Sequence, residues 1–462
     1  MIRLFKHYIP KHLILLGLSE FFIYIYSIYL GTAFRFSSPH LSETADDNLP
    51  LKSLVFALVM YSCMIAMGLY QRHLRDGRRG MFIRVGVSFA IGFVAMSLLF
   101  YLFPSLFMGR GVFAIGFCFA LLAVIAVRLL YIKLVDRKAL NKRVLVLGVG
   151  KKARLMESLL KRRTDRRGFS IVGYVPLADE EVLISKDKLI EHASTLNELV
   201  LQHDVDEIVL AITDRRKTFP VEELLDCKMS GVHVVEIQSF FERQSGRIIL
   251  DVLHPSWLIF SDGFSQGIVR DVIKRTFDIT ASLVLLSITF PIMLVTMICI
   301  YASDRGPIFY RQVRVGQNWR LVQVMKFRSM RTDAEKGGAQ FATANDDRIT
   351  PIGKFIRKTR IDELPQLFNV LKGEMSFVGP RPERPQFVEE FSANIPFYAE
   401  RHRVKPGITG WAQICYPYGS SEKDTIEKLQ YDLYYVKNYS IFLDLTVLFQ
   451  TAEVILWGKG AR

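Results

Sequence analysis

Hydrophobic residues form long runs in the first third of the chain, and the length of each run predicts a helix that crosses a membrane. Each run has about the 20 residues that a helix needs to span a bilayer. The only charges inside the runs are Glu20 and Arg128, which we expect to face neighbouring helices or reach toward the interface. The four runs are Leu13 to Phe34, Ser53 to Tyr70, Val85 to Met108, and Gly111 to about Ile132.

Charged residues around these runs predict their orientation. Lys and Arg cluster before the first run, between the second and third, and after the fourth, whereas the loop at 35–52 carries Glu43, Asp46 and Asp47. Because Lys and Arg are retained on the cytoplasmic side, both ends of a four-helix transmembrane bundle over residues 1–138 are expected in the cytoplasm.

After residue 139 the pattern changes to short apolar strands that alternate with helices. Strands are predicted at 144–148, 169–175, 207–212 and 232–237, with helices at 151–163 and 221–229. This alternation favours a parallel, Rossmann-like α/β domain over residues 139–262.

The turn GVGKKA (148–153) follows the first of these strands and matches the G-x-G-x-x-A pattern of dinucleotide-binding domains. Such domains carry an acidic residue at the end of the second strand. That residue is missing here, because the second strand runs into Pro176 and Leu177. A packing role for the glycines is therefore favoured, and nucleotide binding is the alternative.

A fifth apolar run, Ile279 to Ser303, has no charge and carries Pro291 near its middle. Proline breaks or kinks a helix, and basic residues lie on both sides of the run. We therefore expect a re-entrant helix over 279–303 that turns near Pro291 and leaves by the face it entered. A kinked spanning helix is the alternative. The last run, Ile441 to Trp457, carries Asp444 and Glu453 and is predicted to be an amphipathic helix in the membrane interface.

The composition fits a membrane protein that handles anionic groups. The 462-residue chain is 50% hydrophobic, yet 60 Lys and Arg against 45 Asp and Glu give a net charge of +15. This balance suits soluble parts that face anionic lipid or bind phosphates. We expect no nucleic-acid partner, because a DNA-binding protein does not need such long apolar runs. The five cysteines form no C-x-x-C pair, so neither a disulfide framework nor a zinc site is indicated.

Four cationic segments in the last third of the chain surround one adjacent carboxylate pair, Asp362 and Glu363. Arginine suits phosphate because its planar fork binds two oxygens at once. In such a site one acid coordinates a divalent ion or attacks phosphorus, and the other assists. A capping box, in which Thr359 and Asp362 begin a helix, is the alternative. The cationic segments are KFRSM (326–330), RKTR (357–360), VGPRPER (378–384) and RHRVKPGITGW (401–411).

Residues from about 266 to 462 resemble the catalytic domain of bacterial polyprenyl-phosphate hexose-1-phosphate transferases. The resemblance implies a mainly α, monotopic catalytic domain over residues 263–462, with the re-entrant helix inside it. The parts before it resemble the four transmembrane helices and the Rossmann-like domain of the family's large members. The matching stretches, in family order, are KRTFDITASLVLLSITFPIM, GPIFYRQVRVGQNW, MKFRSMRTDAE, IGKFIRKTRIDELPQLFNVLKGEMSFVGPRPE and RHRVKPGITGWAQI.

The resemblance also implies a role for each matching residue. Asp362 is the nucleophile and a magnesium ligand, and Glu363 is its partner. The implied reaction moves a hexose 1-phosphate from a UDP-sugar, with glucose or galactose expected, to undecaprenyl phosphate. UMP leaves, Mg²⁺ is the cofactor, and the phosphosugar is held covalently on the aspartate. The cations that hold phosphates are Lys326, Arg328, Arg357 and Arg381.

The expected partners are the UDP-sugar, undecaprenyl phosphate and the lipid bilayer, and a homo-oligomer is left open. The reaction would start exopolysaccharide or O-antigen repeat units at the bacterial inner membrane, with the catalytic domain on the cytoplasmic face. Two alternatives stay open: a membrane-bound nucleotide-sugar-modifying enzyme, and a nucleotide-sugar-sensing scaffold that uses GVGKKA. The first needs a Tyr-x-x-x-Lys pair, and none of the 18 tyrosines has Lys four residues later.

Overall fold

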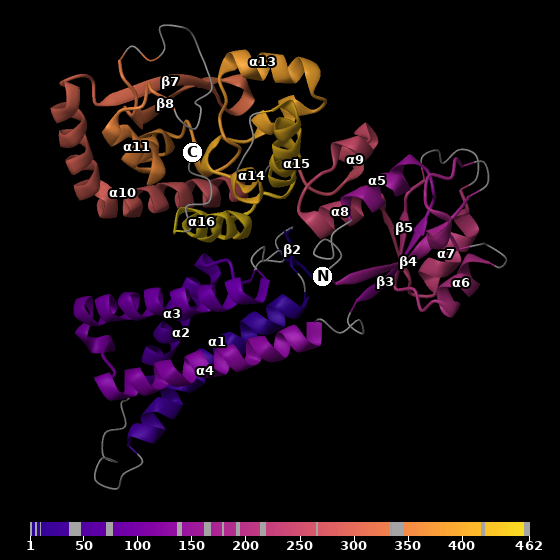
Figure 1. Cartoon of the computed structure of the whole chain (residues 1–462), viewed down its shortest axis with the longest axis horizontal. Helices are drawn as coiled ribbons and strands as arrows, with labels where there is room; N and C mark the ends of the chain where they lie inside the picture. Colours follow the sequence, from indigo (N-terminus) through magenta and orange to yellow (C-terminus); the bar gives the residue numbers. More distant parts are fainter. Residues whose placement is uncertain are drawn as a thin grey trace. The chain divides into compact units, whose positions relative to one another are not determined.

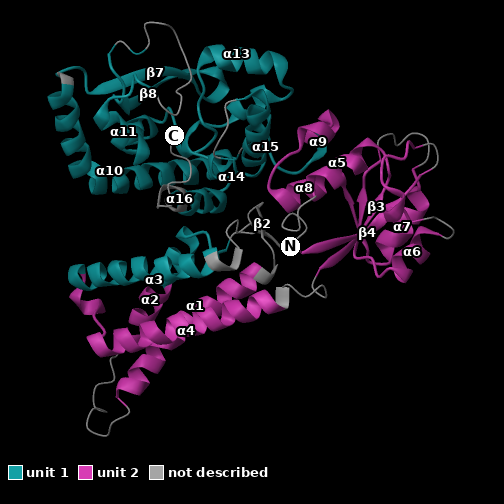
Figure 2. Cartoon of the chain, in the orientation of Figure 1, with its two compact units in different colours: residues 1–11, 58–102, 259–462 teal, residues 12–57, 103–258 magenta. Residues whose placement is uncertain are grey.

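The chain divides into two compact units in the computed structural model (Figure 2). Unit 1 comprises residues 1–11, 58–102 and 259–462, and unit 2 comprises residues 12–57 and 103–258. Glu43, Asp46 and Asp47 of the expected acidic loop lie outside the described residues. The structure describes residues 2–4, 7–9, 11–36, 48–70, 77–135, 141–160, 168–177, 180–190, 195–212, 219–264, 267–332, 334, 346–416 and 421–456.

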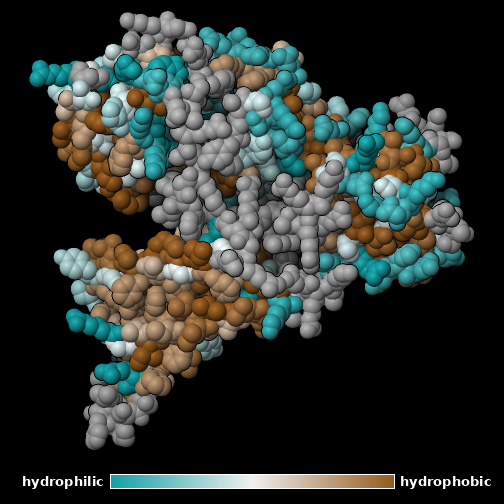
Figure 3. All heavy atoms as spheres, viewed as in Figure 1, coloured by the Kyte–Doolittle hydropathy of each residue, from teal (hydrophilic) through white to brown (hydrophobic). Residues whose placement is uncertain are grey.

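The four N-terminal apolar runs form helices, as predicted. Each is long and apolar enough to cross a membrane, and a fifth helix, α10 (Ile268–Asp304), also qualifies. Hydrophobic side chains cover the visible face of α3 and α4 (Figure 3). The four helices are α1 (Lys11–Arg35), α2 (Leu49–Ala66), α3 (Gly77–Leu102) and α4 (Arg110–Val135), preceded by the short antiparallel strands β1 (Ile2–Leu4) and β2 (His7–Ile9).

Within unit 2, α1 and α4 pack closely against each other. A Cβ atom added to Gly31 of α1 would lie 2.9 Å from the backbone nitrogen of Gly116 of α4, and small residues commonly allow membrane helices to approach in this way. Glu20 and Arg128 form a buried ion pair of 2.7 Å between the same helices. These two charges therefore face a neighbouring helix, which is one of the two expected arrangements.

Unit 2 also contains the predicted α/β sheet. Its strand order is β4-β3-β5-β6 and every neighbouring pair is parallel. Val144 and Val146 pack with α5 and α8 on one face, whereas Leu145 and Leu147 pack with α6 and α7 on the other. Alternate residues of β3 thus fill two separate cores, as expected for a sheet with helices on both faces. The elements are β3 (Lys142–Leu147), α5 (Lys151–Leu159), β4 (Phe169–Val175), α6 (Leu196–Gln202), β5 (Glu207–Leu210), α7 (Val221–Met229), β6 (His233–Glu236) and α8 (Ile237–Ser245).

The C-terminal part of unit 1 is mainly helical, as expected, but it also has two small sheets. Strands β7 (Phe309–Val315) and β8 (Leu321–Phe327) form an antiparallel hairpin, and β9 (Ser376–Val378) pairs in parallel with β10 (Gly407–Thr409). The helices are α9 (Pro255–Phe260), which begins in unit 2, α10 (Ile268–Asp304), α11 (Pro351–Lys358), α12 (Gln366–Lys372), α13 (Pro385–Asn394), α14 (Trp411–Cys415), α15 (Glu422–Asn438) and α16 (Ile441–Leu456).

Helix α10 differs from the predicted re-entrant segment at 279–303 in two ways. It begins at Ile268, and it stays helical through Pro291, the only proline in it. Figure 1 shows α10 as a bent ribbon with two arms, and proline is the usual cause of a sharp bend. The expected break is therefore a bend without loss of helix. The face by which α10 leaves the membrane stays a prediction.

One face of α10 holds segments that surround a cavity of unit 1. The Asp278 carboxylate accepts hydrogen bonds of 3.0 Å from the Phe377 backbone N–H and from the Ser376 hydroxyl. Arg275 donates to the carbonyls of Val370 and Leu371, at 2.6 Å each. Polar side chains of this long apolar helix thus fix the positions of β9 and α12.

The first part of α16 is more buried than an interfacial helix would be. Asp444 is fully buried and accepts from Lys274 of α10 at 2.7 Å and from the Tyr435 hydroxyl at 2.7 Å. The Asp444 carboxylate therefore faces the protein interior, and the location of α16 in the membrane interface stays a prediction.

Candidate active site

A cavity of about 870 Å³ in unit 1 brings the predicted site residues together. Pro291 is the exception and does not line this cavity. Side chains from β7, β8, α11, α13 and α15 also contribute to its wall. The predicted residues that line it are Lys326, Arg328, Arg357, Asp362, Glu363 and Arg381.

The carboxylate pair lies on a short 3₁₀ turn, Ile361–Glu363, directly after α11. Arg360 precedes the turn with a φ of 60°, in the left-handed region, which costs a non-glycine residue on the order of 1 kcal/mol. Thr359 is the C-cap residue of α11, and its hydroxyl donates a hydrogen bond of 2.9 Å to the Phe355 carbonyl. The capping-box alternative was therefore wrong, because Thr359 ends one helix and does not begin another.

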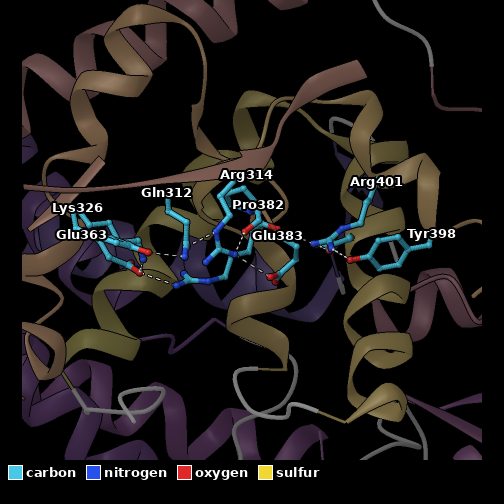
Figure 4. A network of polar contacts seen from close by, with 11 residues as sticks. Gln312, Arg314, Lys326, Glu363, Pro382, Glu383, Tyr398 and Arg401 are labelled. Atoms are coloured by element: carbon cyan, nitrogen blue, oxygen red, sulfur yellow. Dashed lines mark hydrogen bonds and ion pairs between the residues drawn. The ribbon is translucent and has the colours of Figure 1, made fainter. Parts of the chain in front are cut away.

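Glu363 is held by three cations. Its Oε1 atom lies 2.8 Å from Arg381 Nη2, 3.1 Å from Lys326 Nζ and 3.8 Å from Arg360 Nη1, and the Lys326 contact is visible in Figure 4. Burial alone would raise the pKa of Glu363, but the charges of Arg381, Lys326 and Arg360 outweigh it and hold that pKa well below its usual range. Glu363 is therefore ionised at neutral pH.

Asp362 has a different environment although it is the adjacent residue. Burial and the neighbouring Glu363 charge raise the pKa of Asp362 to about 6, against the opposing charges of Lys326, Arg360 and Arg357. Its Oδ1 atom is buried and accepts no hydrogen bond from the described residues. A buried carboxylate oxygen without a partner is suited to bind a cation or to attack an electrophile.

The four predicted phosphate-binding cations fall into two groups. Lys326 and Arg381 contact Glu363, so their charge is shared between this carboxylate and any bound anion. Arg357 and Arg328 also line the cavity, and the charge of Arg357 acts to lower the pKa of Asp362. Together they make the cavity wall strongly cationic around Asp362.

Sequence reasoning missed a second polar network next to this one. Arg314 of β7 contacts Glu383 (Figure 4), and Arg401 forms a buried ion pair of 2.8 Å with Asp432 of α15. The sequence placed the segment that contains Arg401 among the phosphate-binding cations, whereas the structure surrounds this guanidinium with protein acceptors. No sequence pattern near Asp432 indicates this ion pair, because Arg401 lies on a different element far along the chain.

The site fits magnesium only together with phosphates. In the described part of the chain, no group of three or more His, Cys, Asp or Glu side chains could hold a metal ion. Asp362 offers one unpartnered carboxylate oxygen. Mg²⁺ commonly binds one or two carboxylates and takes its other ligands from substrate phosphates and water.

The GVGKKA turn of unit 2 makes contacts that favour the packing interpretation. The Val149 backbone N–H donates to the Glu180 carboxylate at 2.9 Å. A Cβ atom on Gly150 would lie 2.6 Å from Glu180 Oε1, so the missing side chain leaves room for this carboxylate. An amide that would face a cofactor phosphate in a dinucleotide-binding domain is thus used inside the protein.

Comparison with known proteins places the chain among sugar transferases. A family model described as "Bacterial sugar transferase" matches residues 269–458, and one described as "CoA-binding domain" matches residues 65–224. A UDP-N-acetylgalactosamine-undecaprenyl-phosphate N-acetylgalactosaminephosphotransferase of Aeromonas hydrophila is 44% identical over 239 residues, 52% of this chain and 56% of the relative. A UDP-glucose:undecaprenyl-phosphate glucose-1-phosphate transferase of Klebsiella pneumoniae is 40% identical over 235 residues, 50% of each chain. The chain thus spans about half the length of these two relatives.

A third relative aligns over a longer part of both proteins. The undecaprenyl-phosphate galactose phosphotransferase of Salmonella typhimurium is 32% identical over 373 residues, which is 76% of each chain. The sugar-transferase match covers the segment that holds the cavity and every predicted catalytic residue. This chain therefore belongs to the bacterial sugar transferase family.

Proposed function

We propose that this protein transfers a hexose 1-phosphate from a UDP-sugar to undecaprenyl phosphate and releases UMP. The observation that carries the proposal is the buried Asp362 oxygen without a partner, next to a Glu363 that three cations hold. The printed names of the relatives support the two substrates. They differ in the sugar, so glucose, galactose and N-acetylgalactosamine are all candidates.

In the first proposed step, an Asp362 carboxylate oxygen attacks the β-phosphorus of the UDP-sugar. A bond forms between this oxygen and phosphorus, and the bond from phosphorus to the bridging oxygen breaks. The electron pair of that bond leaves with UMP. The charge on the departing phosphate develops within reach of the cationic wall, where Arg357 and Arg328 would stabilise it.

In the second step, a phosphate oxygen of undecaprenyl phosphate attacks the same phosphorus. The acyl phosphate bond to Asp362 breaks, the carboxylate is regenerated, and the product is the sugar linked to the lipid by a diphosphate. Glu363 would hold Lys326 and Arg381 in place through both steps, since it contacts both of them. Two displacements at one carboxylate make this covalent catalysis.

Magnesium would be held by Asp362 and by the substrate diphosphate. It would supply positive charge that neutralises the phosphate oxygens. The geometry of the protein side chains supports such a role only in the presence of the substrate, because the described acids near the cavity do not form a complete ligand set.

The proposed location is the bacterial inner membrane, with four spanning helices and the cavity on the cytoplasmic face. The bent α10 would enter and leave by that face. Its exposed side chains are apolar at many positions, Ile288 at 67% and Phe290 at 60% among them, and Figure 3 shows hydrophobic surface in this region. The reaction would be the first membrane step of exopolysaccharide or O-antigen repeat-unit synthesis.

The test is UMP release by the purified chain in lipid nanodiscs. A panel of UDP-glucose, UDP-galactose and UDP-N-acetylgalactosamine is supplied with undecaprenyl phosphate and Mg²⁺. We expect UMP and a lipid-linked phosphosugar from at least one member of the panel, and neither product from Asp362→Asn. Release of UDP in place of UMP would indicate glycosyl transfer and refute the proposal. A modified nucleotide sugar as the product would favour the sugar-modifying alternative.

A further inference from the structure

The turn that carries Arg381 is fixed through its carbonyl groups. Pro380 and Pro382 flank Arg381 and have no backbone N–H to donate. Each carbonyl from Pro380 to Glu383 accepts a hydrogen bond from another segment. The donors and distances are Gly407 N to Pro380 O at 2.9 Å, Arg401 Nη2 to Arg381 O at 3.0 Å, Arg314 Nη1 to Pro382 O at 3.0 Å, and Val315 N to Glu383 O at 2.9 Å.

Two of these four donors are arginine side chains, and Arg401 is the more buried of the two. It is 6% exposed. Besides the Arg381 carbonyl, its guanidinium donates to the Tyr398 hydroxyl at 2.6 Å and pairs with Asp432 at 2.8 Å. These acceptors fix its orientation, so the donor that reaches Arg381 has little freedom to turn toward a substrate.

Arg314 holds the next carbonyl from β7. The same Nη1 that donates to Pro382 O also donates to the Glu383 carboxylate at 3.2 Å, and its Nε donates to the Gln312 side chain at 2.8 Å (Figure 4). Its side chain is 20% exposed. This guanidinium, like that of Arg401, is directed at protein acceptors.

We propose that Arg314 and Arg401 are positioning residues, which hold the carbonyls of the Pro-Arg-Pro turn so that the Arg381 guanidinium reaches Glu363. They are not phosphate ligands, although both line the cationic cavity. The assays below rest on the proposed function, whereas the contacts do not. The charge of the arginines alone is insufficient for this role, because each must reach several acceptors in fixed directions.

Lysine is therefore the informative substitution. It keeps the positive charge but has one point donor in place of a planar fork. In Arg401→Lys and Arg314→Lys the turn should loosen and Arg381 should leave its position on Glu363. A shift of about 1 Å in a catalytic group can cost about 100-fold in rate. We expect kcat to fall about 10- to 100-fold, with the KM for the UDP-sugar within about twofold of wild type.

The matched control is Arg403→Lys, two positions from Arg401. Arg403 is 65% exposed, pairs with Glu400 at 2.5 Å and does not line the cavity. It should keep wild-type kcat and KM. A KM that rises in Arg401→Lys or Arg314→Lys while kcat is unchanged would show direct binding of the substrate phosphates and would overturn the proposal.

The folded fraction of each variant separates positioning from simple loss of folded protein. We expect kcat per folded chain to fall in the two lysine variants and not in Arg403→Lys. A kcat lowered only in proportion to the folded fraction would contradict the proposal.

A readout without substrate keeps this inference independent of the proposed reaction. The amides of Gly407 and Val315 donate to the other two carbonyls of the turn. Their hydrogen exchange should accelerate in Arg401→Lys and Arg314→Lys and not in the control. If the wild type releases no UMP but exchange responds as expected, the proposed function fails and the positioning role holds. Equal exchange in all three variants overturns the positioning role.

Discussion

The Arg381 guanidinium donates a hydrogen bond of 2.8 Å to the Glu363 carboxylate, across 18 positions of sequence. Lys326, 37 positions from Glu363, binds the same oxygen at 3.1 Å. The Asp362 Oδ1 atom beside them has no hydrogen-bond partner among the described residues. The two adjacent acids thus have different environments. Glu363 contacts cations, whereas Asp362 keeps one oxygen without a hydrogen-bond partner among the described residues.

The first prediction concerns the pH dependence of the first chemical step. In the proposed mechanism Asp362 attacks phosphorus only as a carboxylate, and burial followed by the Glu363 charge raises its pKa to about 6. The rate should therefore fall as pH decreases through about 6. UMP release in a single turnover without lipid acceptor measures this step and excludes titration of the lipid phosphate. A rate that stays constant down to about pH 5 would contradict the assignment.

A second prediction follows from the same pKa. The folded-state pKa of about 6 exceeds the usual value of about 3.9 for an unfolded aspartate. Ionisation of Asp362 therefore weakens the folded state above about pH 6, and this cost disappears below about pH 4. Asp362→Asn should melt at a higher temperature than wild type at about pH 7.5, with the difference shrinking toward pH 4. A variant that is less stable at neutral pH would show that the carboxylate has a stabilising partner.

The apolar pattern predicted the membrane helices and the parallel sheet because both depend on local regularity. The runs around Glu20 and Arg128 form helices, and β3 to β6 lie within or next to the predicted strands. The cationic segments and the carboxylate pair also meet in one cavity, as expected. The residue pattern was therefore sufficient to predict features that depend on a single helix, strand or sequence motif.

The remaining features depend on contacts between distant elements. Arg401 was grouped with the phosphate ligands because its partner Asp432 lies on α15 and leaves no mark near it in sequence. The capping-box alternative at Thr359 was wrong because Thr359 is the C-cap of α11 and Arg360 after it adopts a left-handed conformation. Pro291 bends α10 without interrupting it, and sequence alone does not distinguish a bend from a break.

The third prediction tests whether the hydrogen bonds between Asp278 of α10 and strand β9 stabilise the site. Asp278→Ala would leave the partly buried Phe377 N–H without this acceptor, at a cost of about 1 kcal/mol. Asp278→Asn keeps an acceptor oxygen and should retain most of the stability. Urea unfolding and UMP release are measured for both variants, with the exposed Thr276→Ala on the same helix as control. Equal losses of stability and activity in the Ala and Asn variants would show that the charge of Asp278, and not its hydrogen bonds to β9, is required.

The fourth prediction concerns the topology of α10. Single cysteines at Ser256 and Lys358, in a chain without the five free cysteines, are labelled from each side of sealed vesicles. Both should react from the cytoplasmic side in wild type. Pro291→Leu should straighten the helix and place position 358 outside in part of the molecules, with activity lost in proportion. Exclusive labelling of position 358 from the outside in wild type would show that α10 spans the membrane.

The central claim is a phosphosugar held covalently on Asp362, and trapping it is the most direct test. The chain is incubated with Mg²⁺ and a UDP-sugar labelled in the sugar, without undecaprenyl phosphate, and the protein is then denatured and separated. We expect up to one label per wild-type chain, located by mass spectrometry on the peptide that contains Asp362, and release of the label when undecaprenyl phosphate is added before denaturation. Label retained by Asp362→Asn, or a wild type that makes product without ever carrying label, would contradict this claim.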